Sequence, residues 1–286
     1  MNDKPLETRN FGGTNQKVTR IGLGGEGVLR THGQIREARE VIQEAIDQGI
    51  SYFDSARVYA DSEVYYGYVW KESPEIRAKI FQASKSASRD KTHALADLEQ
   101  SLDRLQSDYL DLWQIHDVRT PQDLAMISAP GGALEAFVEA KSTGKVRFIG
   151  VTGHHDPKVL TQAVRSWPVD AVMMPVNPVE GVLGGFLTET LPAARKKEIA
   201  VIGMKVLGAA HYLLPRTQIT AETLIRYALS FDIDVAIMGC STSAEIKTLA
   251  TAGRLTKPLA ENNQRYLLSV FKPIARRLAY YRGVIN

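Results

Sequence analysis

The stretch KIFQASKSASRDKTHALADLEQSLDRLQSDYLDLWQIH, residues 79–116, decides the fold. Its two ends, 79–85 and 109–116, are short apolar runs typical of buried β-strands. Residues 92–105 between them carry apolar side chains at helical spacing. A strand, a helix and a second strand in this order form a unit that places a helix against a parallel sheet. The stretch therefore predicts an α/β protein.

The same alternation continues outward in both directions. The predicted strands are 18–25, 50–56, 79–85, 109–116, 146–153, 169–175, 199–205 and 235–239. The predicted helices are roughly 34–48, 61–72, 92–105, 132–143, 157–166, 187–197, 220–231 and 243–251, with an added C-terminal helix over 261–280. Eight strands with intervening helices predict a (β/α)8 TIM barrel. The 286 residues suit one such barrel with additions, so we expect a single domain over 1–286.

An open, doubly wound sheet is the alternative for such a pattern. That fold usually carries G-x-G-x-x-G between a strand and a helix. The nearest match, GLGGEG at 22–27, has different spacing, and the helix begins only near residue 34. We interpret it as a tight turn with close backbone approach. The segments 117–131 and 206–220 are long for barrel loops and are expected to shape a substrate site.

Composition excludes several classes of function. The net charge is +3, and no block of like charges suggests a nucleic-acid arm or a membrane-surface helix. Cys240 is the single cysteine, so neither an intrachain disulfide nor a cysteine-rich metal site is expected. No signal-peptide pattern and no apolar run long enough to span a bilayer occur. We expect a soluble cytoplasmic protein with no nucleic-acid or membrane partner.

Four residues suggest chemistry: Asp54, Tyr59, Lys85 and His116. Each lies at the C-terminal end of a predicted strand or just beyond it. In a barrel such positions converge on one mouth, where that fold places its active site. These four groups suggest proton transfer to a carbonyl oxygen. Reducing a carbonyl group also needs a hydride at carbon, which the protein itself does not have, so a nicotinamide cofactor is expected to supply it.

Each of the four has an expected role in that chemistry. Tyr59 is the expected acid, and the Lys85 ammonium is expected to lower the pKa of its phenol. Asp54 would hold Lys85 charged and in place, and His116 would orient the carbonyl oxygen. His154 and His155 are adjacent in the sequence, which is the wrong spacing for two metal ligands on one helix. No metal is therefore expected.

The motifs around these residues resemble those of the aldo-keto reductase family. FDSARVYADSE (53–63) is similar to the family's D-x-A-x-x-Y-x-x-S-E, and FQASKS and DLWQIH match the lysine and histidine motifs in order. GLGG (22–25), KVRFIGVTG (145–153) and the Asn-Pro pair at 177–178 extend the likeness. The opening RNFGGTNQKVTRIGLG resembles the family's N-terminal hairpin, which closes the barrel floor.

The resemblance implies an enzyme that reduces aldehydes or ketones to alcohols with NAD(P)H. The implied cofactor contacts are Gly25, Asp54, Thr152, Gly153, Met173, Met204, Lys205, Val206, Leu207, Gly239, Ser241 and Glu245. Glu245 aligns with the family's basic residue for a 2′-phosphate, which favours NADH. Membership of this family would in itself favour NADPH, and Lys247 or Arg254 could replace that basic residue. NADPH is therefore expected slightly ahead of NADH.

Two other functions stay open at this point. Met173 and Met204 differ from the residues that contact nicotinamide in the better-known branches of the family. This difference is compatible with a regulatory protein that binds the cofactor but catalyses little reaction. A metal-dependent barrel hydrolase could use His116, His154 and Asp54. A small carbonyl compound is the expected partner, and the protein is expected to be a monomer or a weak homo-oligomer. The sequence does not name the physiological substrate.

Overall fold

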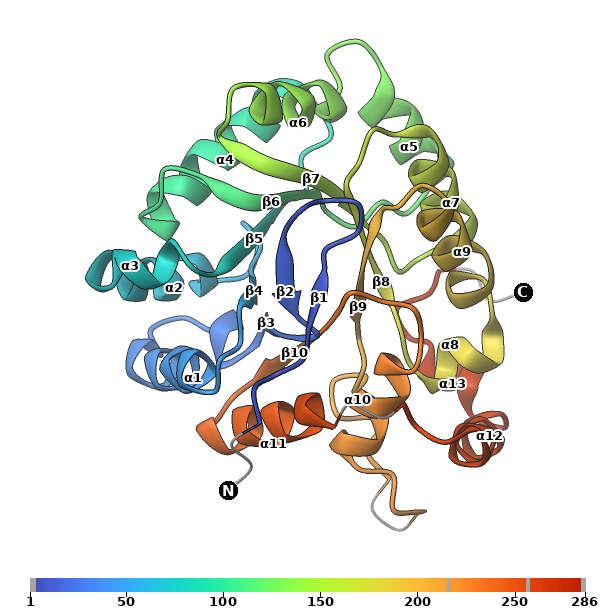
Figure 1. The fold of residues 1–286 in the computed structure, drawn as a ribbon. Coiled ribbons are helices and arrows are strands. Elements are labelled where there is room, and N and C mark those ends of the chain that lie inside the picture. The colour runs from blue at the N-terminus through green and yellow to red at the C-terminus, as the bar shows by residue number, and fades with distance from the viewer. Residues whose placement is uncertain (1–3, 215–216, 256–257, 284–286) are drawn as a thin grey trace.

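Eight parallel strands close into a barrel in the order β10-β3-β4-β5-β6-β7-β8-β9 in the computed structural model, which describes residues 4–214, 217–255 and 258–283. The barrel strands are β3 Ile21–Gly27, β4 Tyr52–Asp54, β5 Phe81–Ser86, β6 Leu110–Ile115, β7 Val146–Thr152, β8 Ala171–Pro175, β9 Ala200–Met204 and β10 Val235–Cys240. The predicted (β/α)8 barrel is confirmed (Figure 1).

Helices surround this barrel on its outside (Figure 1). They are α1 Ile35–Asp47, α2 Ser62–Glu72, α3 Pro74–Arg77, α4 Lys91–Leu105, α5 Pro121–Ser128, α6 Ala133–Ser142, α7 Pro157–Ser166, α8 Pro178–Leu183, α9 Leu191–Lys196, α10 Ala221–Leu229, α11 Ser243–Arg254, α12 Glu261–Phe271 and α13 Ala275–Leu278. A 3-10 turn (Val28–Arg30) follows β3, and a π-helical turn (Phe186–Thr190) precedes α9. In the described part of the chain no helix is long and apolar enough to cross a membrane.

The N-terminal hairpin pairs β1 (Thr8–Asn10) with β2 (Lys17–Thr19). It lies across one end of the barrel, in front of the strands in Figure 1. Its presence confirms the implied hairpin and corrects the predicted strand 18–25. Val18 and Thr19 belong to β2 and pair with Arg9 and Thr8 of β1, and the barrel strand β3 begins only at Ile21. The sequence pattern marks no boundary here, because both segments are extended strands and only Arg20 separates them.

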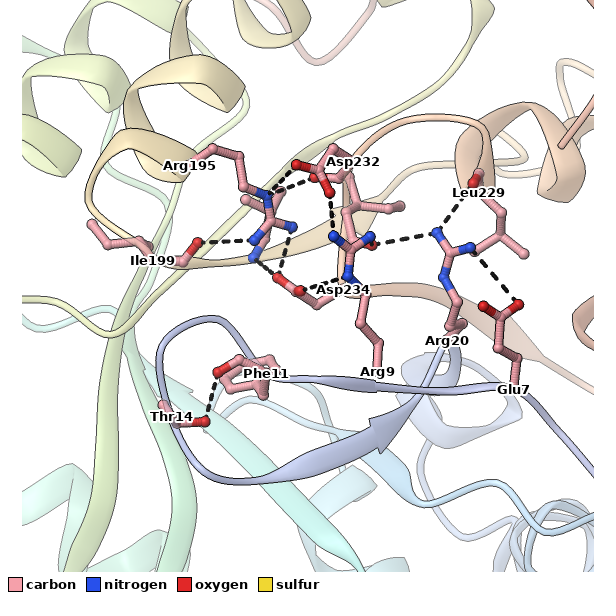
Figure 2. Close-up of polar contacts among 12 residues, drawn as sticks. Glu7, Arg9, Phe11, Thr14, Arg20, Arg195, Ile199, Leu229, Asp232 and Asp234 are labelled. Atoms are coloured by element: carbon pink, nitrogen blue, oxygen red, sulfur yellow. Dashed lines mark hydrogen bonds and ion pairs between the residues drawn. The ribbon is translucent and has the colours of Figure 1, made fainter. Parts of the chain in front are cut away.

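Charged side chains fasten the hairpin to the barrel floor (Figure 2). Arg9 donates to Ile233 O at 3.1 Å and is ion-paired with Asp232 and Asp234. Asp234 is almost fully buried and also pairs with Arg195 at 2.8 Å. Its carboxylate accepts the backbone N–H of Val201 as well. These contacts satisfy a buried carboxylate that would otherwise be costly.

Aromatic rings fill the barrel interior next to the hairpin. Phe11 is fully buried, with its ring centroid 4.8 Å from that of Phe81 and 6.1 Å from that of Tyr52. Burying one such ring contributes roughly 1.5–3 kcal/mol. The floor is therefore closed, and only the opposite end, where the strands have their C-termini, is open to chemistry.

The predicted single helix over 261–280 is wrong. The chain forms α12, ends it at Phe271, and starts the short α13 at Ala275. Pro273 explains the break, because proline lacks an N–H to donate to the preceding turn and its ring clashes with that turn's backbone. Both segments lie beside α8 in Figure 1, so the C-terminal region returns toward the barrel.

Candidate active site

The structure brings the four predicted catalytic residues together at the C-terminal mouth. Asp54 ends β4, Lys85 lies near the end of β5, and His116 follows β6 directly. Tyr59 lies in the loop between β4 and α2. Because these strands are neighbours in the barrel, their ends converge as the sequence pattern predicted.

Lys85 and Asp54 form a buried ion pair. Lys85 Nζ lies 2.5 Å from Asp54 Oδ2 and donates to Ser55 O at 2.6 Å. Their side chains are 1% and 2% exposed, so water screens the pair little. The ammonium is thus held by a carboxylate, as expected.

Tyr59 lies close to both Lys85 and His116. Its ring centroid is 4.9 Å from Lys85 Nζ, and it meets the His116 ring edge-on with centroids 5.5 Å apart. The Arg30 guanidinium covers the ring at 4.7 Å. A phenol, an imidazole and an ammonium therefore share one small region at the mouth.

Backbone contacts hold the Tyr59 loop against β5. Ser55 N–H donates to Ala83 O at 2.9 Å, and Arg57 N–H donates to Lys85 O at 3.0 Å. Gly25 packs beneath the phenol, since a Cβ there would lie 2.8 Å from Tyr59 Cδ2 and 2.9 Å from Asp54 O. Only a glycine leaves Tyr59 this position.

The Ser-Glu end of the tyrosine motif has a structural role. Glu63 is fully buried, accepts a hydrogen bond from Ser84 Oγ at 2.6 Å, and pairs with Arg104 at 3.2 Å. Ser84 neighbours Lys85 on β5. Glu63 therefore ties the start of α2 to the strand that carries the lysine.

The expected lowering of the Tyr59 pKa is wrong. Burial raises this pKa well above its usual value, and the Asp54 and Glu26 carboxylates raise it further. Asp54 compensates the Lys85 ammonium, which leaves little net positive charge beside the phenol. Tyr59 consequently keeps its proton at neutral pH, so it holds a proton to give but is a weaker acid than an ordinary phenol.

His116 is a neutral imidazole at neutral pH. Burial, and then the Lys85 ammonium, lower its pKa to about 3. Its backbone is fixed on both sides: the N–H donates to Ser86 O at 2.8 Å, and the carbonyl accepts from Arg89 at 2.9 Å. A neutral ring can donate one N–H to a carbonyl oxygen, the role expected of it.

The predicted nicotinamide contacts lie on β3, β7, β8 and β9 or just after them, near the same mouth. Thr152 Oγ1 already accepts the Asp117 N–H at 2.8 Å, Met173 is buried in the barrel interior, and Val206 is buried in the surrounding core. Met204 and Lys205 are half-buried. Within the described residues the Lys205 ammonium has no hydrogen bond or ion pair, and its nearest aromatic ring is Tyr281 at 5.4 Å. An unpaired cation of this kind suits a phosphate or carboxamide oxygen.

The predicted adenine end lies at the junction of β10 and α11. Gly239, Ser241 and Glu245 are exposed there. Ser241 N–H donates to the Glu245 carboxylate at 2.6 Å, so a side chain of this protein takes a donor that could serve a phosphate. Lys247 pairs with Glu44 at 3.6 Å, and Arg254 bonds to Gln48 at the far end of α11.

Sequence reasoning missed the C-terminal segment, which docks at the mouth. Tyr281 donates to Glu180 Oε1 at 2.7 Å, and Arg282 forms a buried ion pair with the same carboxylate. His154, considered above as a metal ligand, lies 3.1 Å from an Asp117 oxygen and 3.2 Å from Tyr281 O. No sequence motif marks these contacts, because all of them except His154–Asp117 join residues more than a hundred positions apart.

Two surface hollows lie away from this site. One, of about 370 Å³, is lined by residues of the hairpin and the barrel floor, among them Arg9, Gly12 and Glu198. It lies at the wrong end of the strands for barrel chemistry. The other is lined mainly by α6, with one residue each from α4 and α5. Among the described residues no group of three or more His, Cys, Asp or Glu side chains is placed to hold a metal ion.

This geometry gathers a phenol, an imidazole and a buried ammonium–carboxylate pair at the mouth of a barrel, and comparison with known proteins identifies the family. The sequence profile of the Aldo/keto reductase family matches residues 20–216, so the chain belongs to that family.

The individual relatives share only about a third or less of their aligned residues with this chain. An L-galactose dehydrogenase from Arabidopsis thaliana is 29% identical over 71% of this chain and 66% of its own length. A glyoxal reductase from Bacillus subtilis is 34% identical over 44% of this chain and 45% of its own. The chain thus spans about two thirds or less of these curated relatives. The holo form of an aldo-keto reductase from Bacillus halodurans shares the fold, with a TM-score of 0.76, 20% identity and 98% of each chain covered.

Proposed function

We propose that this chain is an NAD(P)H-dependent oxidoreductase that reduces aldehydes or ketones to alcohols. The observation that carries the proposal is the meeting of Tyr59, His116 and the Lys85–Asp54 pair at the open end of the barrel. Membership of the Aldo/keto reductase family supports it.

Each residue has one task in the proposed reaction. The nicotinamide coenzyme, when bound, supplies the hydride to the carbonyl carbon. Tyr59 gives its proton to the carbonyl oxygen, and neutral His116 donates a hydrogen bond to that oxygen. Lys85, held by Asp54, then faces the phenolate that Tyr59 becomes. Proton return from solvent completes the cycle, and the reverse direction oxidises an alcohol.

We infer that the coenzyme site accepts NADH at least as readily as NADPH. The expectation of NADPH rested on membership of the family and on Lys247 or Arg254 as a 2′-phosphate partner, and both of these side chains bond to other residues. The Glu245 carboxylate beside Ser241 N–H would repel that phosphate. Fluorescence titration with NADH and with NADPH measures the preference. Glu245→Arg should shift it toward NADPH, and an unaltered affinity ratio would refute this placement of the adenine site.

We propose a small, oxygen-rich carbonyl compound as the substrate. The side chains around Tyr59 are mostly charged: Arg30 and Glu26 form an ion pair at 2.7 Å, and Asp117 pairs with His154. Such a rim suits hydroxyl or carbonyl oxygens better than an extended apolar body. The relatives named glyoxal reductase and L-galactose dehydrogenase fit this class. A panel of glyoxals, sugar aldehydes and aromatic ketones tests it, and a preference for the aromatic ketones would refute it.

The alternative of a regulatory barrel makes a different prediction for the same panel. One round of coenzyme oxidation without steady turnover on any carbonyl would favour it. A cytoplasmic location and a monomeric or weakly associating state also remain proposals, which cell fractionation and sedimentation test.

A further inference from the structure

The barrel interior beneath the Lys85–Asp54 pair holds polar groups that the mechanism above does not use. Gln114 on β6 is fully buried, and neither polar atom of its amide has a hydrogen-bond partner among the described residues. Asp54 Oδ1 is also buried and unpartnered, although Oδ2 is bound to Lys85. Buried polar groups without partners are rare and need an explanation.

Strand register places Gln114 beside the catalytic pair. Gln114 lies directly opposite Lys85 across the β5–β6 ladder. Because paired residues of parallel strands point to the same face, both side chains project into the barrel. On the other side, Gln114 faces Gly150 of β7. A Cβ at Gly150 would lie 3.0 Å from Gln114 Cγ, so the missing side chain makes room for the glutamine.

The electrostatics of Asp54 agree with this placement. Burial raises the pKa of this carboxyl group, the Lys85 ammonium opposes that effect most strongly, and the nearby Gln114 side chain opposes it further. The other ionisable groups that face Asp54 are Glu26 on β3, Tyr52 on β4, Tyr59 in the following loop and Tyr66 on α2. Among these groups, the Tyr52 hydroxyl is buried without a hydrogen-bond partner, so it is the rival donor to Asp54.

We propose that Gln114 is a positioning residue whose amide N–H donates to Asp54 Oδ1 and keeps that carboxylate ionised against Lys85. The inference rests on the proposed function, in which the Lys85–Asp54 pair supports Tyr59. Gln114 touches neither substrate nor coenzyme in this account. It acts through Asp54, and it would supply a donor to an oxygen that has no hydrogen-bond partner among the described residues.

The test is the pH dependence of kcat for Gln114→Met, which keeps the volume and removes the amide. Without the donor, Asp54 takes up its proton at higher pH, and the acid limb of kcat should move up by about one pH unit. Gln114→Glu places a second carboxyl group beside Asp54 and should move the limb further in the same direction. Coenzyme affinity, read by fluorescence, should not change in either variant.

Gln82→Met is the matched control. Gln82 is equally buried on β5, but its amide is satisfied by Trp70 Nε1–H and Ala83 O. Its loss should lower stability and leave the acid limb in place. Unchanged limbs in both Gln114 variants would overturn the inference. It would also be overturned if Tyr52→Phe moved the limb instead, since the buried Tyr52 hydroxyl is the rival donor.

The two proposals fail separately. Full turnover in Tyr59→Phe would refute the proposed function itself. A dead Tyr59→Phe enzyme together with unshifted Gln114 variants would refute only the role of Gln114.

Discussion

Replacing Lys85 with methionine separates the structural from the chemical role of the buried ion pair. The substitution leaves Asp54 fully buried without its cation. Removing one partner of such a pair costs about 3–5 kcal/mol in the free energy of unfolding. The double variant Lys85→Met/Asp54→Asn leaves no uncompensated charge and should recover most of that loss. Neither variant should reduce carbonyls, because the group that faces Tyr59 is gone.

The loss in Lys85→Met should also depend on pH. Asp54 has a pKa of about 3.9 when unfolded, and burial raises it in the folded protein. The folded state then binds more protons than the unfolded state, so stability falls as pH rises between the two pKa values. At about 1.4 kcal/mol per pH unit, a loss of 3–5 kcal/mol corresponds to about 2–4 units.

Urea unfolding at pH 5 and pH 8, with carbonyl reduction measured on the same samples, tests both points. A double variant with wild-type turnover would refute the role of the pair in catalysis. A Lys85→Met protein that becomes less stable on acidification would refute the charge argument.

Two further predictions concern groups around the pair. Because the pKa of His116 is about 3, kcat/KM should show no inflection near pH 6.5 from this residue; an inflection there that disappears in His116→Gln would contradict its neutral state. Arg282→Ala leaves the buried Glu180 carboxylate unpaired and should cost about 3–5 kcal/mol in urea unfolding. Burial raises the pKa of Glu180, so this cost should be larger at pH 8 than at pH 5, and equal stability of variant and wild type at pH 8 would contradict the pairing.

The fold was predictable because it depends on local periodicity repeated along the chain. Each strand and helix of the barrel has its own apolar pattern, and the strand ends converge by topology alone. The convergence of Asp54, Tyr59, Lys85 and His116 follows from that rule. The break at Pro273 was visible in the sequence but was masked by a long amphipathic pattern.

Other features depend on contacts between distant residues, which no local pattern encodes. The docking of Tyr281 and Arg282 on Glu180 is one example. The pKa of Tyr59 is another, because burial and the Asp54 charge outweigh the ammonium that the motif places nearby. The unpartnered amide of Gln114 becomes visible only when β5, β6 and β7 are set side by side.

The central claim is that the Tyr59 hydroxyl gives the proton, and stopped-flow reduction of a small aldehyde by Tyr59→Phe tests it most directly. The variant lacks only the hydroxyl. Turnover should fall by about 10²–10⁴, the usual worth of a general acid, while fluorescence titration gives an unchanged coenzyme affinity. Wild-type turnover in that variant would contradict the account.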